Sequence, residues 1–345
     1  MTKILTYPEI APTAWQELVD SSPYATWFQT PEAYAFYASN PDEMTPFAYA
    51  VAEDSSSPQS PIAISPYRLK ALCVGYITKE KSAIKQFFTR RAIIIGGPLL
   101  AEDATEQNVE QLLRATIAEL QSQAIYVETR NFNDYSKWKT IFEQCGFSYQ
   151  PHLNFHVDTH SIDLVEFNLG KSRKRDIKTS IRDGATIVNN PTIEQVREYY
   201  TLLKQLYTTK IKTPLFSLSF FEKLYAMTSG RFILVELNGE IIGGTVCVEL
   251  AGKCLYEWFV CGRDGEWKSI FPSSLATYAG IRYAAEHGCN RFDMMGAGKT
   301  DEAYGVRDFK ARFGGEQVEY GRCLYIRKPL LYWIGKMGVK WLKRK

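Results

Sequence analysis

Apolar residues recur along this chain at two spacings, one typical of helices and one typical of strands. Between Thr105 and Gln121 they fall on one face, which predicts an amphipathic helix with an inner row of Val109, Leu112, Leu113, Ile117 and Leu120. The alternating stretches 232–237 and 241–250 flank Asn238-Gly239 and predict a β-hairpin. Short apolar runs predict buried strands at 92–95, 125–129 and 291–294. Helices and strands therefore alternate through the whole chain.

The order of the predicted elements repeats once. Each half has helices, a hairpin, another strand, a long helix, a strand, a short helix with phenylalanine and glycine, and a last strand. The closing elements are 125–127, 142–147 and 153–157 in the first half, and 291–294, 309–314 and 319–326 in the second. A repeat of this size indicates a duplicated domain, and 345 residues suffice for two. We predict an α/β (α+β) chain with two domains, each a mixed β-sheet flanked by helices.

Composition limits the class of protein. A hydrophobic content of 45% with 23% charged residues is typical of a globular protein, and a net charge of +3 does not by itself indicate nucleic-acid binding. The seven cysteines are scattered without a C-x-x-C pair, which favours a reducing compartment and argues against a zinc site. We find no signal-peptide pattern and no apolar run of about 18 residues, so we expect a cytoplasmic protein.

The segment Gly298-Lys299-Thr300 has the ending of a phosphate-binding loop. That motif, G-x-x-x-x-G-K-[ST], requires a glycine where this chain has Asp293. Without that glycine the backbone cannot wrap a phosphate in the same way, so we interpret the segment as a turn after a sheet strand. The stretch 291–315 is nevertheless a candidate ligand-binding segment, because ligands of open α/β sheets bind beyond the carboxyl ends of the strands.

The stretch 170–184 is the most basic part of the chain. Its acids are Asp176 and Asp183, and its bases are Lys171, Arg173, Lys174, Arg175, Lys178 and Arg182. As a helix it would turn Ile177 and Ile181 inward and its cations outward. Such a helix either neutralises phosphates or forms a solvated face, and the two interpretations are about equally supported.

Polar residues alternate along a second stretch, around the predicted strand 153–157. They are His152, Asn154, His156, Asp158 and His160. Their common face could bind a metal ion. We favour a half-solvated strand face, because no glutamate or cysteine joins the set.

Four segments carry a resemblance to a known family: FFTRRAIIIGGPLL (87–100), LGKSRKRDIKTSIRDGATI (169–187), IIGGTVCV (241–248) and YGVRDFKARFGG (304–315). They resemble the Fem family, the aminoacyltransferases that build peptidoglycan cross-bridges and were first linked to methicillin resistance. The element order is similar to a doubled GNAT acyltransferase fold. The Phe-Lys dipeptide ahead of Phe-Gly is the most specific feature. The helical-hairpin arm of the staphylococcal members is missing.

The resemblance implies transfer of an aminoacyl group from a charged tRNA to an amine of a cell-wall precursor. That reaction needs a proton acceptor and positive charge near an oxyanion. Lys310 matches the family lysine thought to stabilise this charge or the tRNA end, and Phe309 precedes it as in the family. Asp308 would orient Lys310 or pair with Arg307. The expected substrate- and phosphate-binding residues are Lys171, Arg173, Arg175, Lys178, Arg307, Arg312, Tyr304, Tyr256, Gly296 and Gly298.

The donor is the first open question. GNAT enzymes that use coenzyme A hold its pyrophosphate with an Arg/Gln-x-x-Gly-x-Gly/Ala turn after the fourth strand, and Val260–Ser274 lacks that pattern. The alternative is an acyl-CoA-dependent N-acyltransferase acting on an amino sugar or another polysaccharide precursor. A third hypothesis is a non-catalytic RNA- or precursor-binding protein. We expect no metal and no tightly bound cofactor, with aminoacyl-tRNA and a nucleotide- or lipid-linked cell-wall precursor as partners.

The C-terminal stretch predicts an amphipathic helix with Leu330, Trp333, Ile334, Met337 and Trp341 on one face. In the family this segment packs back on the first domain, and we favour that role for the apolar stripe. The resemblance thus implies a first domain of 1–150 with 327–345, and a catalytic second domain of 151–326. The basic remainder, Lys336, Lys340, Lys343, Arg344 and Lys345, could also approach the inner leaflet of the membrane.

Overall fold

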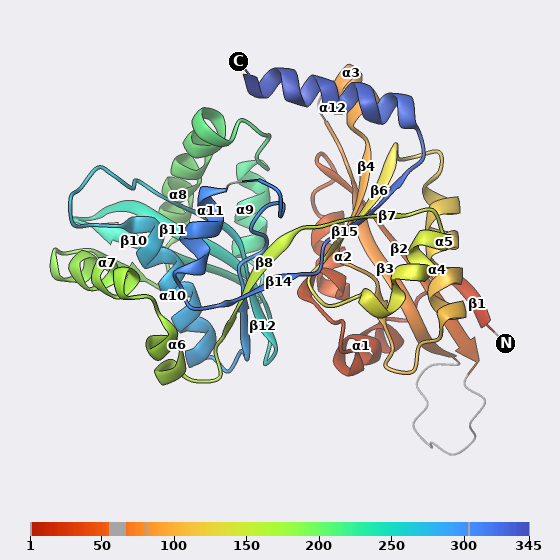
Figure 1. Ribbon diagram of the computed structural model, residues 1–345, viewed down its shortest axis with the longest axis horizontal. Helices are drawn as coiled ribbons and strands as arrows, with labels where there is room; N and C mark the ends of the chain where they lie inside the picture. The colour runs from red at the N-terminus through yellow and green to blue at the C-terminus, as the bar shows by residue number, and fades with distance from the viewer. Residues whose placement is uncertain (1, 55–66, 81, 303, 345) are drawn as a thin grey trace. The chain divides into compact units, whose positions relative to one another are not determined.

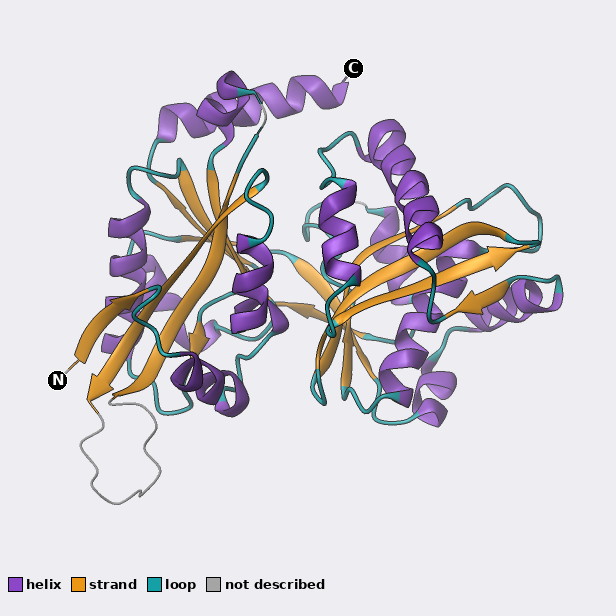
Figure 2. Ribbon diagram, turned by 180° about the vertical axis from the view of Figure 1, so that it is seen from behind, coloured by secondary structure: helices purple, strands orange, loops and turns teal. Residues whose placement is uncertain are grey.

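The computed structural model describes residues 2–54, 67–80, 82–302 and 304–344, with only the backbone described for 83–85 and 339–344. The chain forms two compact units (Figure 1). Unit 1 comprises Met1–Pro151 and Tyr320–Lys345, and unit 2 comprises His152–Glu319. Each unit has a β-sheet with helices on both faces (Figure 2).

Unit 1 is built on a mixed sheet with the order β1-β2-β3-β4-β6-β15-β7, and β5 pairs with β3. The β4–β6 pair is parallel. Its strands are β1 Thr2–Thr6, β2 Met44–Asp54, β3 Tyr67–Thr78, β4 Arg91–Gly96, β5 Leu99–Leu100, β6 Tyr126–Asn131, β7 Ser148–Gln150 and β15 Arg322–Ile326.

The helices of unit 1 are α1 Pro12–Ser21, α2 Pro31–Ala38, α3 Ala83–Thr89, α4 Glu106–Leu120, α5 Lys139–Gln144 and α12 Pro329–Arg344, with 3-10 turns η1 Trp27–Gln29 and η2 Ser136–Trp138. The predicted amphipathic helix is confirmed as α4. Thr105 caps it by accepting a hydrogen bond from the amide of Asn108, and its apolar row is buried except for the partly exposed Ile117.

Unit 2 has the sheet order β14-β8-β13-β12-β11-β10-β9. Its strands are β8 Leu153–Asp158, β9 Thr186–Val188, β10 Gly230–Leu237, β11 Glu240–Leu250, β12 Cys254–Gly262, β13 Arg291–Asp293 and β14 Glu316–Glu319. Its helices are α6 Ile162–Asn168, α7 Lys171–Arg182, α8 Ile193–Leu206, α9 Leu218–Tyr225, α10 Pro272–Glu286 and α11 Gly305–Ala311, with a π-helical turn η3 Tyr207–Ile211. The predicted hairpin at Asn238-Gly239 is confirmed, since β10 and β11 pair across it.

Each half of the chain gives its last strand to the sheet of the other half. The last strand of the first half, β8, lies between β13 and β14 in unit 2. The last strand of the second half, β15, lies between β6 and β7 in unit 1. The two sheets are therefore completed reciprocally.

This exchange corrects the predicted strand over 319–326 and the second-domain boundary at 326. The stretch is two strands, because the chain turns at Tyr320-Gly321, where Gly321 has a positive φ of 61°. Before the turn β14 pairs with β8, and after it β15 pairs with β6. Residues 320–326 therefore belong to unit 1.

A second correction concerns helix α12, which packs on unit 1 through a face other than the predicted apolar stripe. Tyr332 makes an edge contact with Tyr126, with ring centroids 5.2 Å apart. A Cβ on Gly335 would lie 2.9 Å from the carbonyl oxygen of Phe88, so the helix and α3 lie in close contact there. The stripe residues Leu330, Trp333, Ile334 and Met337 remain exposed, and Trp341 lies outside the described side chains.

Strands β12 and β13 separate at the point where the candidate site begins. They pair in parallel over Cys254–Tyr256 and Arg291–Asp293, after which β13 ends while β12 continues to Gly262. A bulge at Trp258 interrupts the pairing of β12 with β11 just beyond this point. The backbone after Asp293 thus has no strand partner on its β12 side, and side chains must satisfy its polar groups.

Candidate active site

Lys310 on α11 supplies the hydrogen bonds that the backbone beyond β13 requires. Its side chain is buried, with 7% exposed, and its Nζ donates to the carbonyl oxygens of Met294 and Gly296, the latter at 2.8 Å. Burial lowers the pKa of Lys310, and the nearby carboxyls of Glu257 and Asp293 oppose that shift. An ammonium has three N–H donors, so one remains after these two contacts.

Glu257, in the middle of β12, is a second buried ionisable side chain and was missed by the sequence analysis. Its Oε1 accepts hydrogen bonds from Thr277 at 2.9 Å and Thr245 at 3.3 Å. No described residue donates to its Oε2. Burial raises the pKa of this carboxyl, although Lys310 and the two hydroxyls act in the opposite direction. The sequence feature that could have identified Glu257 is the presence of a charged residue inside the otherwise apolar stretch CLYEWFV.

Asp293 is fully buried and has different partners. Its Oδ1 accepts from Asn154 Nδ2 at 2.7 Å, and His156 Nε2 lies 3.0 Å from its Oδ2. Burial alone would raise the pKa of Asp293, but His156 lowers it overall. Asn154 in turn accepts from the amide of Gly296 at 2.7 Å, so the cluster holds the backbone that Lys310 contacts.

The polar strand face is half-solvated, as predicted, because Asp158 and His160 at its far end are exposed. Asn154 is buried and the His156 side chain is only 10% exposed, because both point to Asp293. The opposite side chains Leu153, Phe155 and Val157 are buried in the hydrophobic core of unit 2. Across the described ranges, no group of three or more His, Cys, Asp or Glu side chains is arranged to hold a metal ion.

The loop with Gly298-Lys299-Thr300 is tied to its own unit. Gly298 has a positive φ of 81°, and its carbonyl oxygen accepts from the amide of Leu153 at 2.9 Å. A Cβ there would lie 2.7 Å from the ring of Tyr304, so Tyr304 packs on a position that tolerates only glycine. This geometry is that of a turn, and the expected ligand contacts of Gly296, Gly298 and Tyr304 remain predictions.

Arg307 holds the same loop, and its expected phosphate contact remains a prediction. Its Nε donates to the carbonyl oxygen of Ala297 at 3.1 Å and its Nη2 donates to that of Lys299. Asp308 is exposed on the first turn of α11, and in the described structure no hydrogen bond or ion pair joins it to Lys310 or Arg307. The prediction that Asp308 orients Lys310 or pairs with Arg307 is therefore wrong.

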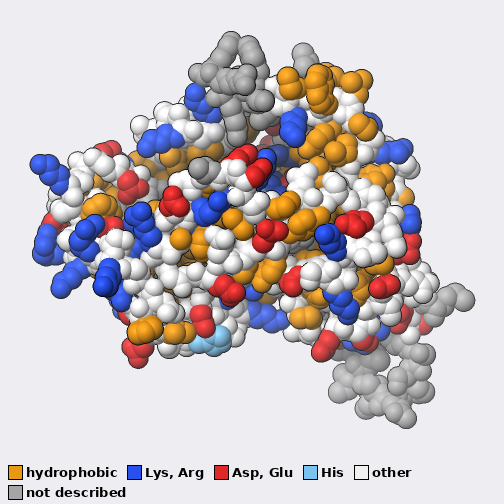
Figure 3. All heavy atoms as spheres, viewed as in Figure 1, with side chains coloured by type: hydrophobic (Ala, Val, Ile, Leu, Met, Phe, Trp, Pro, Cys, Tyr) orange, Lys and Arg blue, Asp and Glu red, His pale blue; other side chains and the backbone are white. Residues whose placement is uncertain are grey.

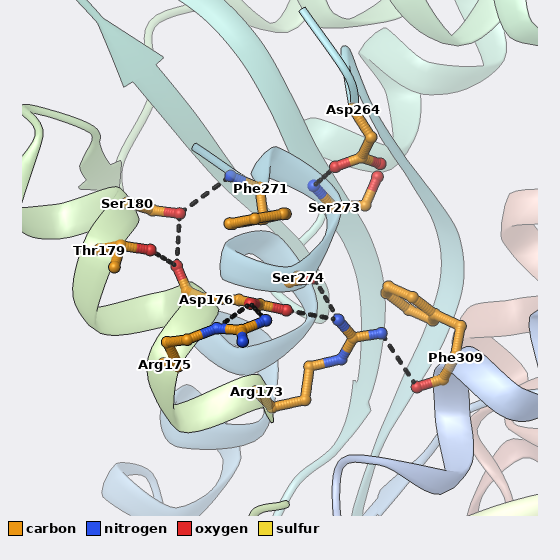
Figure 4. Close-up of polar contacts among 10 residues, drawn as sticks. All are labelled: Arg173, Arg175, Asp176, Thr179, Ser180, Asp264, Phe271, Ser273, Ser274 and Phe309. Carbon is orange, nitrogen blue, oxygen red and sulfur yellow. Dashed lines mark hydrogen bonds and ion pairs between the residues drawn. The ribbon is translucent and has the colours of Figure 1, made fainter. Parts of the chain in front are cut away.

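Arg173 also departs from its expected role, because it is only 6% exposed. Its Nη1 donates to Ser274 Oγ at 2.9 Å and to Asp176 Oδ2 at 3.1 Å, and its Nη2 donates to the carbonyl oxygen of Phe309 at 3.4 Å (Figure 4). Its guanidinium carbon lies 4.4 Å from the centroid of the Phe309 ring. Arg173 joins α7, α10 and α11 and cannot neutralise an external phosphate, and Phe309 is its packing partner.

At the N-terminus of α10, two backbone donors are engaged by side chains of the same unit (Figure 4). The amide of Phe271 donates to Ser180 Oγ at 2.9 Å, and that of Ser273 donates to Asp264 Oδ1 at 3.2 Å. Pro272, between them, has no N–H. A carboxylate of the chain therefore lies where helix N-termini commonly bind an anion.

The remaining basic residues of α7 do face outward. Lys171, Lys174, Arg175 and Lys178 are exposed, and Figure 3 shows Lys and Arg side chains gathered where Figure 1 draws α7. Arg175 also pairs with Asp176 at 3.1 Å. Ile177 is buried as expected, whereas Ile181 is 50% exposed, contrary to the predicted inward position.

Two further expected residues lie in contrasting places. Arg312 is exposed just after α11 and is free to meet a ligand from solvent. Tyr256 is fully buried in β12, and burial raises its pKa well above the ordinary value. The expected substrate contact of Tyr256 remains a prediction.

Comparisons with known proteins fit this architecture. Residues 171–310 match the family model "Acetyltransferase (GNAT) domain", from the first residue of α7 to Lys310. No curated protein matches the sequence. The fold is similar to the crystal structure of FemX, with a TM-score of 0.70, 13% identity, and coverage of 96% of this chain and 99% of that one.

Two other solved structures are similar over nearly their whole lengths. A tandem GNAT protein from the clavulanic acid biosynthesis pathway has a TM-score of 0.56 and 9% identity, covering 95% of this chain and 99% of that one. The C-terminal domain of a putative lysylphosphatidylglycerol synthetase from Agrobacterium fabrum has a TM-score of 0.56 and 11% identity, covering 95% of each chain. The predicted fold, two tandem GNAT-like units as in FemX, is confirmed, and the second unit carries an acyltransferase domain.

Proposed function

We propose that this acyltransferase moves an aminoacyl group from a charged tRNA to an amine of a peptidoglycan precursor. The observation that carries the proposal is the buried pair of ionisable groups at the separation of β12 and β13: Lys310, with one donor left, and Glu257, with one oxygen left. Transfer of an acyl group to an amine needs one group that stabilises negative charge and one that accepts a proton.

Lys310 supplies the positive charge in this proposal. When the amine nitrogen attacks the ester carbonyl carbon, a nitrogen–carbon bond forms and the carbonyl oxygen becomes an oxyanion. The two carbonyl contacts fix the Lys310 ammonium before the reaction, and burial in unit 2 strengthens its interaction with the new charge.

Glu257 is the proton acceptor. It takes the proton of the attacking amine, and it returns that proton to the ribose oxygen of the tRNA when the carbon–oxygen ester bond breaks. A raised pKa suits a group that must both accept and return a proton. Thr277 and Thr245 engage Oε1 and thereby leave Oε2 for the reaction.

A covalent enzyme intermediate on sulfur has no support in the structure. All seven cysteines are buried, and burial raises the pKa of Cys261, the one at the far end of β12, to about 12. Such a thiol is protonated at neutral pH and is a poor nucleophile. We therefore favour direct attack by the amine.

The surface of unit 2 favours tRNA over coenzyme A as the donor. At the N-terminus of α10, which follows strand β12, the amides of Phe271 and Ser273 are already engaged by Ser180 and Asp264. The exposed cations Lys171, Lys174 and Lys178 suit the phosphates of an acceptor stem. The GNAT family match alone favours the second candidate, an acyl-CoA-dependent transferase acting on an amino sugar.

The donor is tested with the purified chain and two labelled donors, aminoacyl-tRNA and acetyl-CoA. Each is incubated with a nucleotide-linked precursor, a lipid-linked precursor or an amino sugar. We expect loss of the tRNA ester that requires both protein and a peptidoglycan precursor, and a labelled amide product. Consumption of acetyl-CoA alone would overturn the proposal in favour of the second candidate.

A further inference from the structure

Helix α12 exposes a continuous apolar stripe although it packs on unit 1. The exposed fractions are 71% for Leu330, 59% for Trp333, 38% for Ile334 and 49% for Met337. Their spacing of three, four and seven residues places them on one face. The helix is held on another face, where Tyr332 and Gly335 contact Tyr126 and α3. The stripe is thus not the face that the Tyr332 and Gly335 contacts hold against unit 1.

The apolar surface extends beyond α12. Phe87 of α3 is 50% exposed, and its ring makes an edge contact with that of Phe88, whose carbonyl oxygen approaches Gly335. Figure 3 shows hydrophobic side chains gathered where Figure 1 draws α12 and α3. Contiguous exposed apolar side chains of this kind mark a surface that binds a partner.

The charge of this segment is one-sided. Residues 327–345 contain no Asp or Glu, and their bases are Arg327, Lys328, Lys336, Lys340, Lys343, Arg344 and Lys345. The whole chain has a net charge of only +3, so this positive charge is a local feature. A helix with exposed Leu and Trp on one face and only cations among its charged residues is suited to the boundary between lipid headgroups and acyl chains.

We propose that α12, together with Phe87, docks the chain on the surface of an anionic phospholipid bilayer. The apolar stripe enters the boundary of the acyl chains, and Arg327 and Lys336, the exposed cations among the described side chains of this segment, contact the phosphates of the headgroups. At 16 residues α12 lies along the surface, and no described helix is long and apolar enough to span a membrane. A second copy of this chain is a poorer occupant, because two such segments would bring like charges together. The inference goes beyond the transferase reaction and does not depend on it.

Vesicle flotation tests the proposal with the full chain. We expect binding to vesicles of phosphatidylcholine with phosphatidylglycerol to be about tenfold stronger than to phosphatidylcholine alone, and to weaken at high salt. Trp333→Asp abolishes the binding. Phe167→Asp is the matched control, because Phe167 is an 81% exposed aromatic residue of unit 2, and it leaves binding unchanged.

A site-specific probe gives a second measurement. All native cysteines are buried, so Leu330→Cys and Lys336→Cys can each be labelled with an environment-sensitive fluorophore. We expect a blue shift with anionic vesicles at position 330 and a much smaller one at 336, which lies off the stripe. The proposal is overturned if wild-type protein does not float with anionic vesicles, if Phe167→Asp loses binding equally, or if Trp333→Asp instead dissociates a dimer in sedimentation.

Discussion

Glu128 in unit 1 and Glu257 in unit 2 are both buried glutamates on central strands, with opposite electrostatic surroundings. Glu128 Oε1 lies 2.7 Å from Arg322 Nη1 and 3.2 Å from Arg130 Nε. Burial would raise the pKa of Glu128, but the two arginines lower it to about 2. Glu257 has hydroxyl partners instead, and burial raises its pKa. One carboxylate is fixed as a structural anion, and the other is able to exchange a proton.

The short helices after β6 and β13, α5 and α11, also differ in the residue that follows their phenylalanine. In unit 1, Phe142 of α5 is buried and Glu143, the next residue, is exposed. In unit 2, Phe309 of α11 is half-buried and the next residue, Lys310, is buried beneath it. Among the described residues, a buried cation with a buried glutamate near it, whose pKa is raised, occurs at this position only in unit 2. The comparison shows that the buried glutamate of unit 1 is paired with two arginines, whereas the buried glutamate of unit 2 has only hydroxyl groups as hydrogen-bond partners.

The largest expected effect follows removal of the buried cation. Lys310→Met should lower turnover by about 10³-fold, because the oxyanion loses its charged donor. The initial rate of aminoacyl transfer measures the effect. Lys299→Met is the matched control, since Lys299 is exposed and pairs only with Glu302. Equal activity of the two variants would remove Lys310 from the mechanism.

Replacing Glu257 should cost about 10²-fold in turnover, the usual contribution of a general base. Glu257→Gln keeps the shape and can still accept from Thr277. Glu128→Gln is the control in the other repeat and should leave the rate per folded molecule unchanged. A normal rate for Glu257→Gln would assign proton transfer to another group.

The pH profile of transfer should reflect the same two groups. The reaction needs ionised Glu257, whose pKa is raised, so the acid limb should lie above the ordinary glutamate value of 4.5. It needs protonated Lys310, whose pKa is lowered, so the alkaline limb should lie below 10.5. The logarithm of kcat/KM measured against pH should lose its acid limb in Glu257→Gln. An unchanged profile in that variant would contradict the assignment.

In unit 1 the expected effect is on stability. Glu128→Gln should lower the free energy of unfolding by about 3 kcal/mol near neutral pH, because Arg130 and Arg322 lose a buried partner. The pKa of Glu128 is lowered in the folded state, so this stabilisation is present above 4.5 and is lost as the pH falls toward about 2. Urea unfolding of both proteins at several pH values measures the difference. A difference in unfolding free energy between the two proteins that grows toward acid pH would contradict the predicted direction of this pH dependence.

The smallest effect is expected on the outer face of α7. Lys171→Ala with Lys178→Ala should raise the KM for aminoacyl-tRNA about threefold and reduce its dependence on salt concentration, since each exposed cation releases about one counterion on binding. The unchanged kcat distinguishes this effect from that of Lys310. If the salt dependence of the KM is the same in the double variant as in the wild type, tRNA binds to a surface other than the outer face of α7.

Local patterns predicted the elements well, because they depend on neighbours along the chain. The spacing of Val109, Leu112 and Leu113 gave α4, and Asn238-Gly239 gave the β10–β11 hairpin. The missing glycine at Asp293 excluded a nucleotide loop, and Asp293 instead holds that turn through Oδ1.

Interactions between distant residues escaped prediction. A run of cations has the same sequence pattern whether or not one of them turns inward. The pattern therefore predicts a phosphate contact for Arg173, whereas in the fold its guanidinium donates to Ser274 and to the carbonyl oxygen of Phe309. Glu257 lies in an apolar strand whose pattern gives no reason for a charge. The apolar stripe of α12 predicted burial, but periodicity does not say which partner covers it.

The reciprocal strand exchange constrains how this chain folds. Cys323 on β15 contacts Asn131, at the end of β6, across 192 residues of sequence. The first sheet stays open between β6 and β7 until β15 has left the ribosome, and pairings of such long range form slowly. A chain ending at Glu319 would expose the unpaired edges of β6 and β7, which invite aggregation. Dividing the chain at one position therefore cannot yield two fragments that each contain every strand of one sheet.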